Sequence, residues 1–256
     1  MKRTVLTAAL ICATAAGVLS GCGDGEEDKA GAPPSASAAP TTTAVPKAPF
    51  EGLTAQQISD RAVTAMKALS SVTIDFDGTD SGQKIRMKAA MTNAGKCVSH
   101  IVLGGGNLEL IGVGTDTFAK GDTAFWNAQA GASGPAVNAL LKGRWMKMPA
   151  GSGQDDDFKS FCDLSTFMAG FTESGSGTPV KGAPTVVAGR TTVPISSPDD
   201  GGTTTVYVAA EGEPYILKAV HTGSDPGSAV FTDFDKPLNA VAPPASQTVD
   251  ASALGG

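Results

Sequence analysis

Apolar and polar residues alternate with a period of two over much of the chain. The alternation is clear in four segments, which turns containing Gly or Asn separate: Val72–Asp77, Ile85–Met91, Cys97–Leu103 and Leu108–Val113. Successive side chains of a β-strand point to opposite faces, so this pattern is typical of strands with one buried face and one face in water. The four segments therefore predict a meander of antiparallel hairpins.

Two other regions carry a helical period. Thr54 and Gln57 have the spacing of a capping box, and the apolar residues that follow recur every three or four positions. This pattern predicts a first helix that ends near Ser70. Further helices are predicted over Pro135–Leu141 and after Asp155–Asp157, because a proline and carboxylates favour helix starts.

Strand patterns return in the middle and in the last third of the chain. The segments are Trp145–Met148, Thr185–Ile195, Thr203–Ala210, Tyr215–His221 and Ala229–Phe234. The order helix, strands, helices, strands predicts an α+β fold. We expect a strongly curved antiparallel sheet with helices packed on its concave face.

The first 21 residues have the layout of a removable export signal. Lys2 and Arg3 precede an apolar run that is shorter than the ~20 residues of a membrane-spanning helix. The run ends in Leu19–Cys22, which matches the bacterial lipobox. The match predicts cleavage before Cys22 and lipidation of that cysteine with acyl chains such as palmitate; the alternative is an ordinary secretory signal with a chance cysteine. The expected location is the extracytoplasmic face of the cell membrane, with the chain lipid-anchored.

The segment after the predicted cleavage site is poor in large apolar residues. Residues 22–50 are rich in Pro, Ala, Ser and Thr, a composition that favours an extended tether. Residues 51–256 remain, which is enough for one domain with a substantial core.

Two cysteines are left once Cys12 leaves with the signal and Cys22 is lipidated. Outside the cytoplasm, such a pair predicts a disulfide between Cys97 and Cys162. A zinc site is the alternative, but it needs further ligands that the sequence does not supply in a recognisable pattern.

The predicted disulfide orients one strand. If Cys97 in a strand joins a cysteine in a helix, Cys97 points toward the helical layer. Alternation then places Ser99, Ile101 and Leu103 on the same face and His100 on the opposite face.

Charge and chemistry argue against nucleic-acid binding and catalysis. The chain has 19 basic and 25 acidic residues, and loss of the signal makes it more acidic. Ser81–Lys84 matches the S-x-x-K motif of serine β-lactam enzymes but lies in a predicted hairpin turn, and His100 and His221 are expected at the surface. The run Asp155–Asp157 lacks the loop pattern of a calcium site. The sequence therefore predicts no enzyme and no metal site.

The layout from Leu53 to Asp250 resembles the LppX/LprG-type lipoproteins of actinobacteria, which share their architecture with the periplasmic carrier LolA. One segment departs from the family, because Phe118–Lys120 reads Phe-Ala-Lys where an aromatic-Val-Lys strand end is usual. The segments that carry the resemblance are Thr117–Gly121, Ala124–Trp126, Gly143–Pro149, Val206–Tyr215 and Val230–Phe234.

The resemblance implies a half-open β-barrel whose concave face and helices enclose an apolar cavity. Members of the family bind the acyl chains of lipids or glycolipids there, without a reaction and without a cofactor. Flexible aliphatic side chains suit such a cavity. The residues expected to line it are Ile74, Phe76, Met87, Met91, Ile101, Leu103, Phe161 and Met168.

The functional hypothesis is a membrane-anchored, monomeric lipoprotein that binds acyl lipid or glycolipid and carries or presents it in the cell envelope. The alternative is an envelope lipoprotein of the same fold with a filled core, acting as a protein-binding or sensory module. The two hypotheses differ in whether the space between sheet and helices admits a ligand.

Overall fold

The computed structural model divides the chain into two units, Met1–Val45 and Pro46–Gly256. It describes residues 49–149, 151, 155, 159, 162–172, 177–199 and 201–251, all in the second unit. Cys22, with the predicted signal and most of the predicted tether, lies outside these residues.

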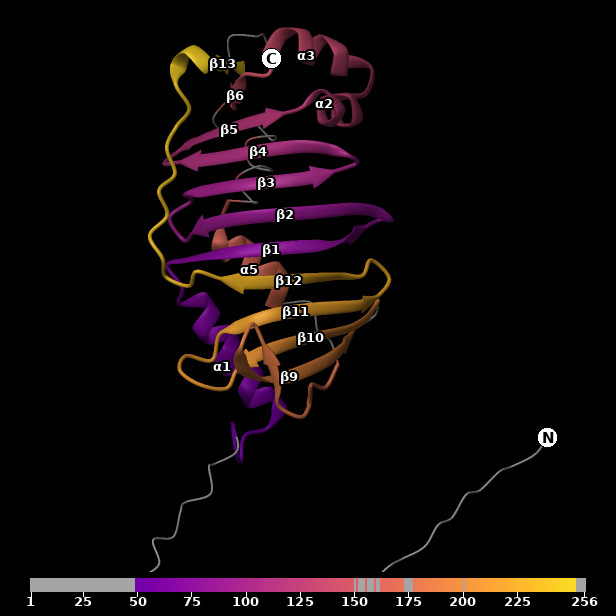
Figure 1. Cartoon of the computed structure of the whole chain (residues 1–256), viewed down its shortest axis with the longest axis vertical. Helices are drawn as coiled ribbons and strands as arrows, with labels where there is room; N and C mark the ends of the chain where they lie inside the picture. The colour runs from indigo at the N-terminus through magenta and orange to yellow at the C-terminus, as the bar shows by residue number, and fades with distance from the viewer. Residues whose placement is uncertain are drawn as a thin grey trace, which may run out of the picture. The chain divides into compact units, whose positions relative to one another are not determined.

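The described part of the second unit is one large curved sheet with helices behind it and at one of its ends (Figure 1). Its helices are α1 (Ala55–Lys67), α2 (Thr123–Ala130), α3 (Gly134–Leu141) and α5 (Leu164–Thr172). Its strands are β1 (Ser71–Asp80), β2 (Gln83–Thr92), β3 (Cys97–Leu103), β4 (Gly106–Val113), β5 (Asp116–Gly121), β6 (Trp145–Lys147), β7 (Val180–Lys181), β8 (Thr185–Val187), β9 (Arg190–Asp199), β10 (Gly202–Ala209), β11 (Ile216–Gly223), β12 (Gly227–Thr232) and β13 (Thr248–Asp250).

The strands follow the order β13-β6-β5-β4-β3-β2-β1-β12-β11-β10-β9-β7, and β8 also pairs with β9. All pairings are antiparallel except that of β13 with β6. The two ends of this order do not pair with each other, so the sheet stays open. The fold is therefore α+β with a half-open, LolA-like barrel, as predicted.

Helix α1 begins where the sequence predicts. The Thr54 hydroxyl accepts a hydrogen bond from the Gln57 backbone N–H (3.2 Å), and the Gln57 side chain accepts one from the Thr54 N–H (3.0 Å), which completes the capping box. The helix ends at Lys67 rather than near Ser70. The backbone N–H of Ser70 instead donates to the Asp235 carboxylate (2.8 Å), which draws the chain out of the helix and into β1.

The predicted strand Thr185–Ile195 is two strands. Ala188 and Gly189 have φ values of 48° and 77° and form a two-residue turn between β8 and β9, with Val187 paired to Arg190. Left-handed φ values at both central positions are typical of a tight hairpin turn. The β-rich composition around this turn concealed it in the sequence pattern.

The hairpin between β1 and β2 fixes the register of the sheet's central strands. Asp80 pairs with Gln83 around Ser81 and Gly82, both of which have positive φ. Ser81 is therefore a hairpin residue, as predicted. The tight turn sets Phe76 opposite Met87 and Ile74 opposite Ala89.

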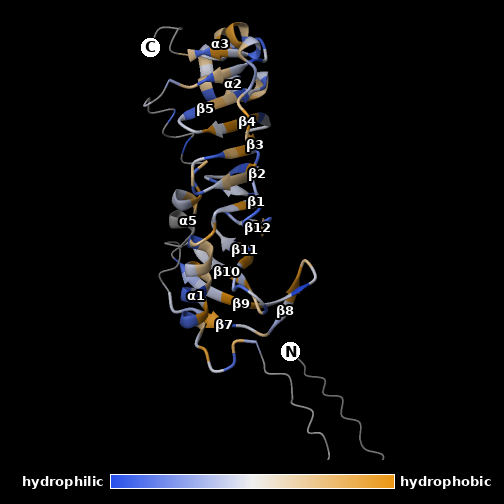
Figure 2. Ribbon diagram, turned by 90° about the vertical axis from the view of Figure 1, so that its left-hand side faces the viewer, coloured by the Kyte–Doolittle hydropathy of each residue, from blue (hydrophilic) through white to orange (hydrophobic). Residues whose placement is uncertain are grey.

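Helices α1 and α5 lie on the same side of the sheet, behind it in Figure 1 and to its left in Figure 2. We call this side of the sheet the inner face and the opposite side the outer face. Ile58, Ala62 and Met66 of α1 are fully buried, and they belong to the same hydrophobic core as the inner-face side chains.

Candidate functional site

The inner face of β1–β4 is apolar and ordered in rows of directly opposed residues. Strand pairing aligns each row across the four strands, and every second residue of a strand faces inward. The rows are the disulfide row Val72, Met91, Cys97 and Gly112; the middle row Ile74, Ala89, Ser99 and Leu110; and the mouth row Phe76, Met87, Ile101 and Leu108.

Burial falls along the inner face from the disulfide row to the mouth row. Met91 and Cys97 are 0% exposed, whereas Met87 is 8% and Ile101 is 6% exposed. Phe76 in the mouth row is half-buried, as are Ile85 and Leu103, the opposed pair beyond it. The inner face is therefore closed at the disulfide row and partly open to solvent beside Phe76.

Two glycines make room for the aromatic ring at this opening. Gly78 of β1 is paired with Gly227 of β12. A Cβ atom on Gly78 would lie 2.6 Å from the Phe76 ring, and one on Gly227 would lie 3.3 Å from it. The ring therefore lies over backbone, and a side chain at Gly78 would displace it.

Helix α2 covers the inner face at β4 and β5. A Cβ on Gly106 would collide with the backbone of Phe125, and one on Gly121 would collide with the rings of Phe125 and Trp126. These glycines let α2 approach the sheet closely. The Trp126 indole N–H donates to the Gly121 carbonyl (3.0 Å), which fixes the contact.

Asp122 ties α2 to the sheet. Its carboxylate caps the helix by accepting from the Phe125 N–H (2.8 Å), and it accepts from the Asn107 side chain of β4 (2.7 Å). The hydrogen bond from Asn107, followed by that from Phe125, lowers the pKa of Asp122. The charged form of Asp122 is therefore the one that holds the cover in place.

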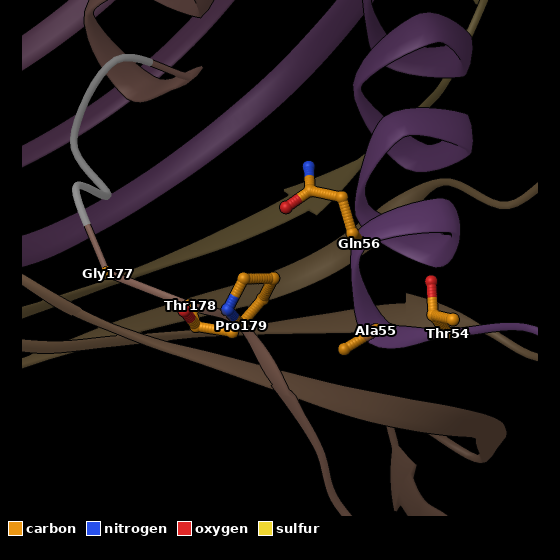
Figure 3. Close-up of a pocket in the computed structure, with 6 residues that line it drawn as sticks. All are labelled: Thr54, Ala55, Gln56, Gly177, Thr178 and Pro179. Atoms are coloured by element: carbon orange, nitrogen blue, oxygen red, sulfur yellow. The ribbon is translucent and has the colours of Figure 1, made fainter.

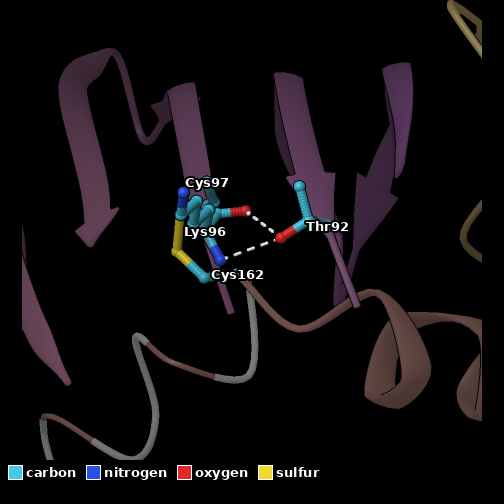
Figure 4. Close-up of a disulfide and its surroundings, with 4 residues drawn as sticks. All are labelled: Thr92, Lys96, Cys97 and Cys162. Atoms are coloured by element: carbon cyan, nitrogen blue, oxygen red, sulfur yellow. Dashed lines mark hydrogen bonds between the residues drawn. A yellow bond between two sulfur atoms is a disulfide. The ribbon is translucent and has the colours of Figure 1, made fainter. Parts of the chain in front are cut away.

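The disulfide between Cys97 and Cys162 is present and joins β3 to the segment before α5 (Figure 4). The two Cα atoms are 5.0 Å apart, a normal separation for a disulfide. Next to it, the Thr92 hydroxyl accepts from the Lys96 N–H (3.1 Å), and Thr92 also forms a parallel bridge to Asp163. The disulfide thus fastens the α5 segment to the closed end of the inner face.

The residues predicted to line a cavity have a common location. Ile74, Met87, Met91, Ile101 and Met168 are buried in one core cluster, and Phe76 and Leu103 are half-buried against it. Phe161, the eighth, lies outside the described residues. Which of them contact a ligand stays a prediction.

Several inner-face residues were absent from the predicted set. Leu108 and Leu110 complete two rows from β4, and Ile85 lies at the opening. The alternation in each strand already carried this signal, because Ile85 has the same parity as Met87. What the sequence lacked was the register between β3 and β4.

One polar side chain lies among these apolar residues. Ser99 is 2% exposed and sits in the middle row between Ala89 and Leu110. Within the described part of the chain, its hydroxyl has no hydrogen-bond partner. Leaving a buried hydroxyl without a partner costs roughly 1–3 kcal/mol.

The two histidines take different positions. His100 is exposed on the outer face, as parity predicted. His221 is half-buried at the end of β11; its Nδ1 lies 3.0 Å from the Thr204 hydroxyl and its Nε2 lies 3.1 Å from the Ser224 carbonyl. The Asp199 carboxylate accepts from Thr204 (3.1 Å) and lies 3.5 Å from Nδ1. This network holds the β9–β10 and β11–β12 turns together, which is a structural role.

Asp155 is a buried carboxylate paired with an amine. It accepts from the Lys159 ammonium (2.6 Å) and from the Gly151 N–H (3.0 Å). Burial raises its pKa, but the hydrogen bonds from Lys159, Gly151 and Thr117 outweigh that effect, and the pKa lies below its usual value. Asp156 and Asp157 of the same acidic run lie outside the described residues.

A pocket lies at the start of α1 (Figure 3). It has a volume of about 360 Å³ and no charged side chain among its lining residues. The Gln56 side chain extends from α1 toward the segment Gly177–Pro179. The other lining residues are Thr54 and Ala55. This set offers hydrogen-bonding groups but no residue suited to catalysis.

In the described part of the chain, no group of three or more His, Cys, Asp or Glu residues is placed to hold a metal ion. None of the helices described there combines the length and the apolar character needed to cross a membrane.

Comparison with known proteins reveals similarity of fold but not of sequence. No protein-family model matches the sequence, and no curated protein does. Among solved structures, LprF from Mycobacterium bovis matches with a TM-score of 0.51 and 13% identity, over 74% of this chain and 96% of LprF. This likeness supports the LolA-like fold described above.

Two further solved structures match with lower TM-scores. The lipoprotein LppX from Mycobacterium tuberculosis matches with a TM-score of 0.47 and 12% identity, over 73% of this chain and 98% of LppX. A LolA superfamily protein from Nitrosomonas europaea matches with a TM-score of 0.25 and 9% identity, over 73% of this chain and 96% of its own.

Proposed function

We propose that this protein is a membrane-anchored lipoprotein that binds an acyl lipid or glycolipid at its inner face and carries or presents it in the cell envelope. The observation that carries the proposal is the apolar inner surface of the sheet from Met91 through Met87 to Phe76, which is fully buried at one end and half-buried at the other. A hydrocarbon chain needs such a surface, with flexible walls that adapt to its shape. The fold shared with LprF supports the proposal.

The proposal includes the anchor and the family. Residues 1–21 act as a signal, Cys22 takes the lipid, and residues 22–50 form the tether of a domain over residues 51–256. The chain is then an actinobacterial relative of the LppX/LprG-type lipoproteins, monomeric and without catalytic activity. Metabolic labelling with a palmitate analogue tests the anchor: the wild-type protein takes up label and stays with membranes, and Cys22→Ala does neither. Label on Cys22→Ala would refute lipidation at this residue.

The test of ligand binding is native mass spectrometry of the protein purified from its own envelope, followed by lipid extraction. The expected result is a stoichiometric adduct whose mass matches an extracted acyl lipid. A protein with no adduct that also fails to take up offered lipids would refute the carrier function.

A filled core is the second candidate. Ile74 and Met91 are 0% exposed and Met168 is 1% exposed, as they would be in a core that never admits a ligand. The protein would then act as a protein-binding or sensory module in the envelope. Cross-linking in intact cells distinguishes the two candidate functions. A protein-binding module is expected to form a cross-linked adduct with one defined protein, whereas a carrier is expected to form an adduct with lipid.

A further inference from the structure

The middle row of the inner face contains a polar group that the fold itself does not use. The Ser99 side chain faces inward, is 2% exposed, and has no hydrogen-bond partner within the described residues. The residues opposite it on both sides, Ala89 and Leu110, have no polar side-chain atoms. Buried hydroxyl groups in folded proteins are generally hydrogen-bonded, so an unpartnered one calls for an explanation.

Three other buried or half-buried polar side chains of the sheet show the contrast. The Ser71 hydroxyl donates to the Lys236 carbonyl (2.6 Å), and the Ser196 hydroxyl pairs with that of Thr205 (2.9 Å). Thr192 is fully buried and donates to the Thr185 carbonyl (3.1 Å). Ser99 differs from these three because it has no such partner within the described residues and lies on the inner face, where the proposed ligand would bind.

We infer that the Ser99 hydroxyl is the hydrogen-bonding partner of an oxygen atom carried on the hydrocarbon chain of the bound lipid. This inference rests on the proposed function. Ser99 then determines specificity: it favours a chain with a hydroxyl group over the same chain without one. The hydrogen bond between Ser99 and the ligand oxygen gives each of these buried polar groups a partner.

The depth of Ser99 indicates which part of a lipid it meets. Leu103, at the open end, is four residues further along β3, a distance of ~13 Å at the usual rise of a strand. A headgroup that remains near the solvent lies beside Leu103 and Ile85, not beside Ser99. The oxygen that reaches Ser99 therefore belongs to the chain rather than to the headgroup.

The test is a competition in native mass spectrometry with the full protein. Oleic acid and ricinoleic acid are offered together at equal concentration; they have the same chain, and ricinoleic acid adds one mid-chain hydroxyl. The wild-type protein is expected to prefer ricinoleic acid by about two- to tenfold, the range that one hydrogen bond contributes. Ser99→Ala is expected to remove the preference while still binding oleic acid.

The matched control is Ser196→Ala, which deletes a strand hydroxyl that is already paired with Thr205. It is expected to keep the wild-type preference. An oleic acid derivative with its hydroxyl beside the carboxyl group tests the depth and is expected to gain nothing over oleic acid. A gain equal to that of ricinoleic acid would place the contact at the headgroup and overturn the inference.

The failures of the two proposals are distinguishable. If the wild-type protein binds neither fatty acid, the proposed function fails. If it binds both equally, or if Ser99→Ala keeps the preference, lipid binding stands and the role of Ser99 is refuted.

Discussion

The two faces of the same strands differ sharply in polarity. The inner face packs into the core, and the outer face is in contact with water. On the inner face, the middle and mouth rows are apolar except for Ser99. On the outer face, the opposed residues of β1–β5 form a polar row in which acidic and basic side chains are mixed: Asp75, Lys88, His100, Glu109 and Lys120. A slip of one residue in any strand would exchange the faces, so the outer charges and the inner apolar rows both hold the register.

The largest effect is expected from releasing the closed end of the inner face. Replacing Cys97 and Cys162 together by Ser removes a cross-link between residues 65 apart in sequence. The expected loss of unfolding free energy is about 4 kcal/mol in the chain-entropy estimate. Urea unfolding of the variant and of the reduced wild-type protein measures it. If neither is less stable than the oxidised protein, the disulfide contributes nothing to holding the α5 segment.

Substituting two adjacent residues of β4 compares the packing of the two faces directly. Leu110 faces inward and is fully buried, whereas Ile111 faces outward and is half-buried. Leu110→Ala is expected to cost about 3 kcal/mol, because it leaves a cavity in the core, and Ile111→Ala clearly less. Chemical denaturation measures both. Equal losses would mean that the inner face is no better packed than the outer one.

The cover of the inner face responds to acid through Asp122. Because its pKa is lowered in the folded protein, its stabilising contribution is complete above the ordinary pKa of about 3.9 and is lost as the pH falls through the lowered value. Asp122→Asn keeps a capping oxygen but loses the negative charge at the start of α2, so it is expected to cost up to about 1 kcal/mol near neutral pH and to flatten the acid side of the stability profile.

Asp77→Asn, an exposed change on the outer face, is the control and is expected to keep the wild-type profile. Thermal unfolding at a series of pH values measures both variants. An unchanged acid side in Asp122→Asn would show that this cap does not contribute to the pH dependence of stability.

The smallest effect is expected from the outer charges. The Lys120 ammonium lies 3.5 Å from the Glu109 carboxylate, and both side chains are at least one-third exposed. Glu109→Gln is expected to cost less than about 1 kcal/mol, and the difference is expected to vanish at high salt. A larger loss of unfolding free energy that persists in high salt would contradict the view that the outer-face charges form weak, water-exposed ion pairs.

The sequence predicted which side chains of a strand face inward better than it predicted which strands pair with each other. Alternation correctly placed Ile101 inward and His100 outward, and the capping box correctly located the start of α1. The Ala188–Gly189 turn was missed because apolar and β-branched residues surround it. The parallel pairing of β13 with β6 has no periodic signal, since three residues are too short to show one.

The residue types of the candidate site were predictable from the sequence, but its shape was not. Methionines and aliphatic residues at inward positions indicated an apolar surface. The decrease in burial from Met91 to Phe76 depends on how the helices cover the sheet. The periodic pattern of apolar residues in the sequence does not show where the helices pack. The isolation of the Ser99 hydroxyl likewise depends on which residues face it across β2 and β4.

The most direct test of the central claim is to block the inner face with one bulky side chain and to measure lipid occupancy. Ile101→Trp fills the mouth row, and Val98→Trp, on the outer face of the same strand where the native side chain is 40% exposed, is the matched control. Native mass spectrometry of both variants with oleic acid, after thermal unfolding has shown that they fold, gives the occupancy. The account predicts a loss of about tenfold or more in Ile101→Trp and wild-type occupancy in Val98→Trp. Wild-type occupancy in Ile101→Trp, or equal losses in both variants, would contradict it.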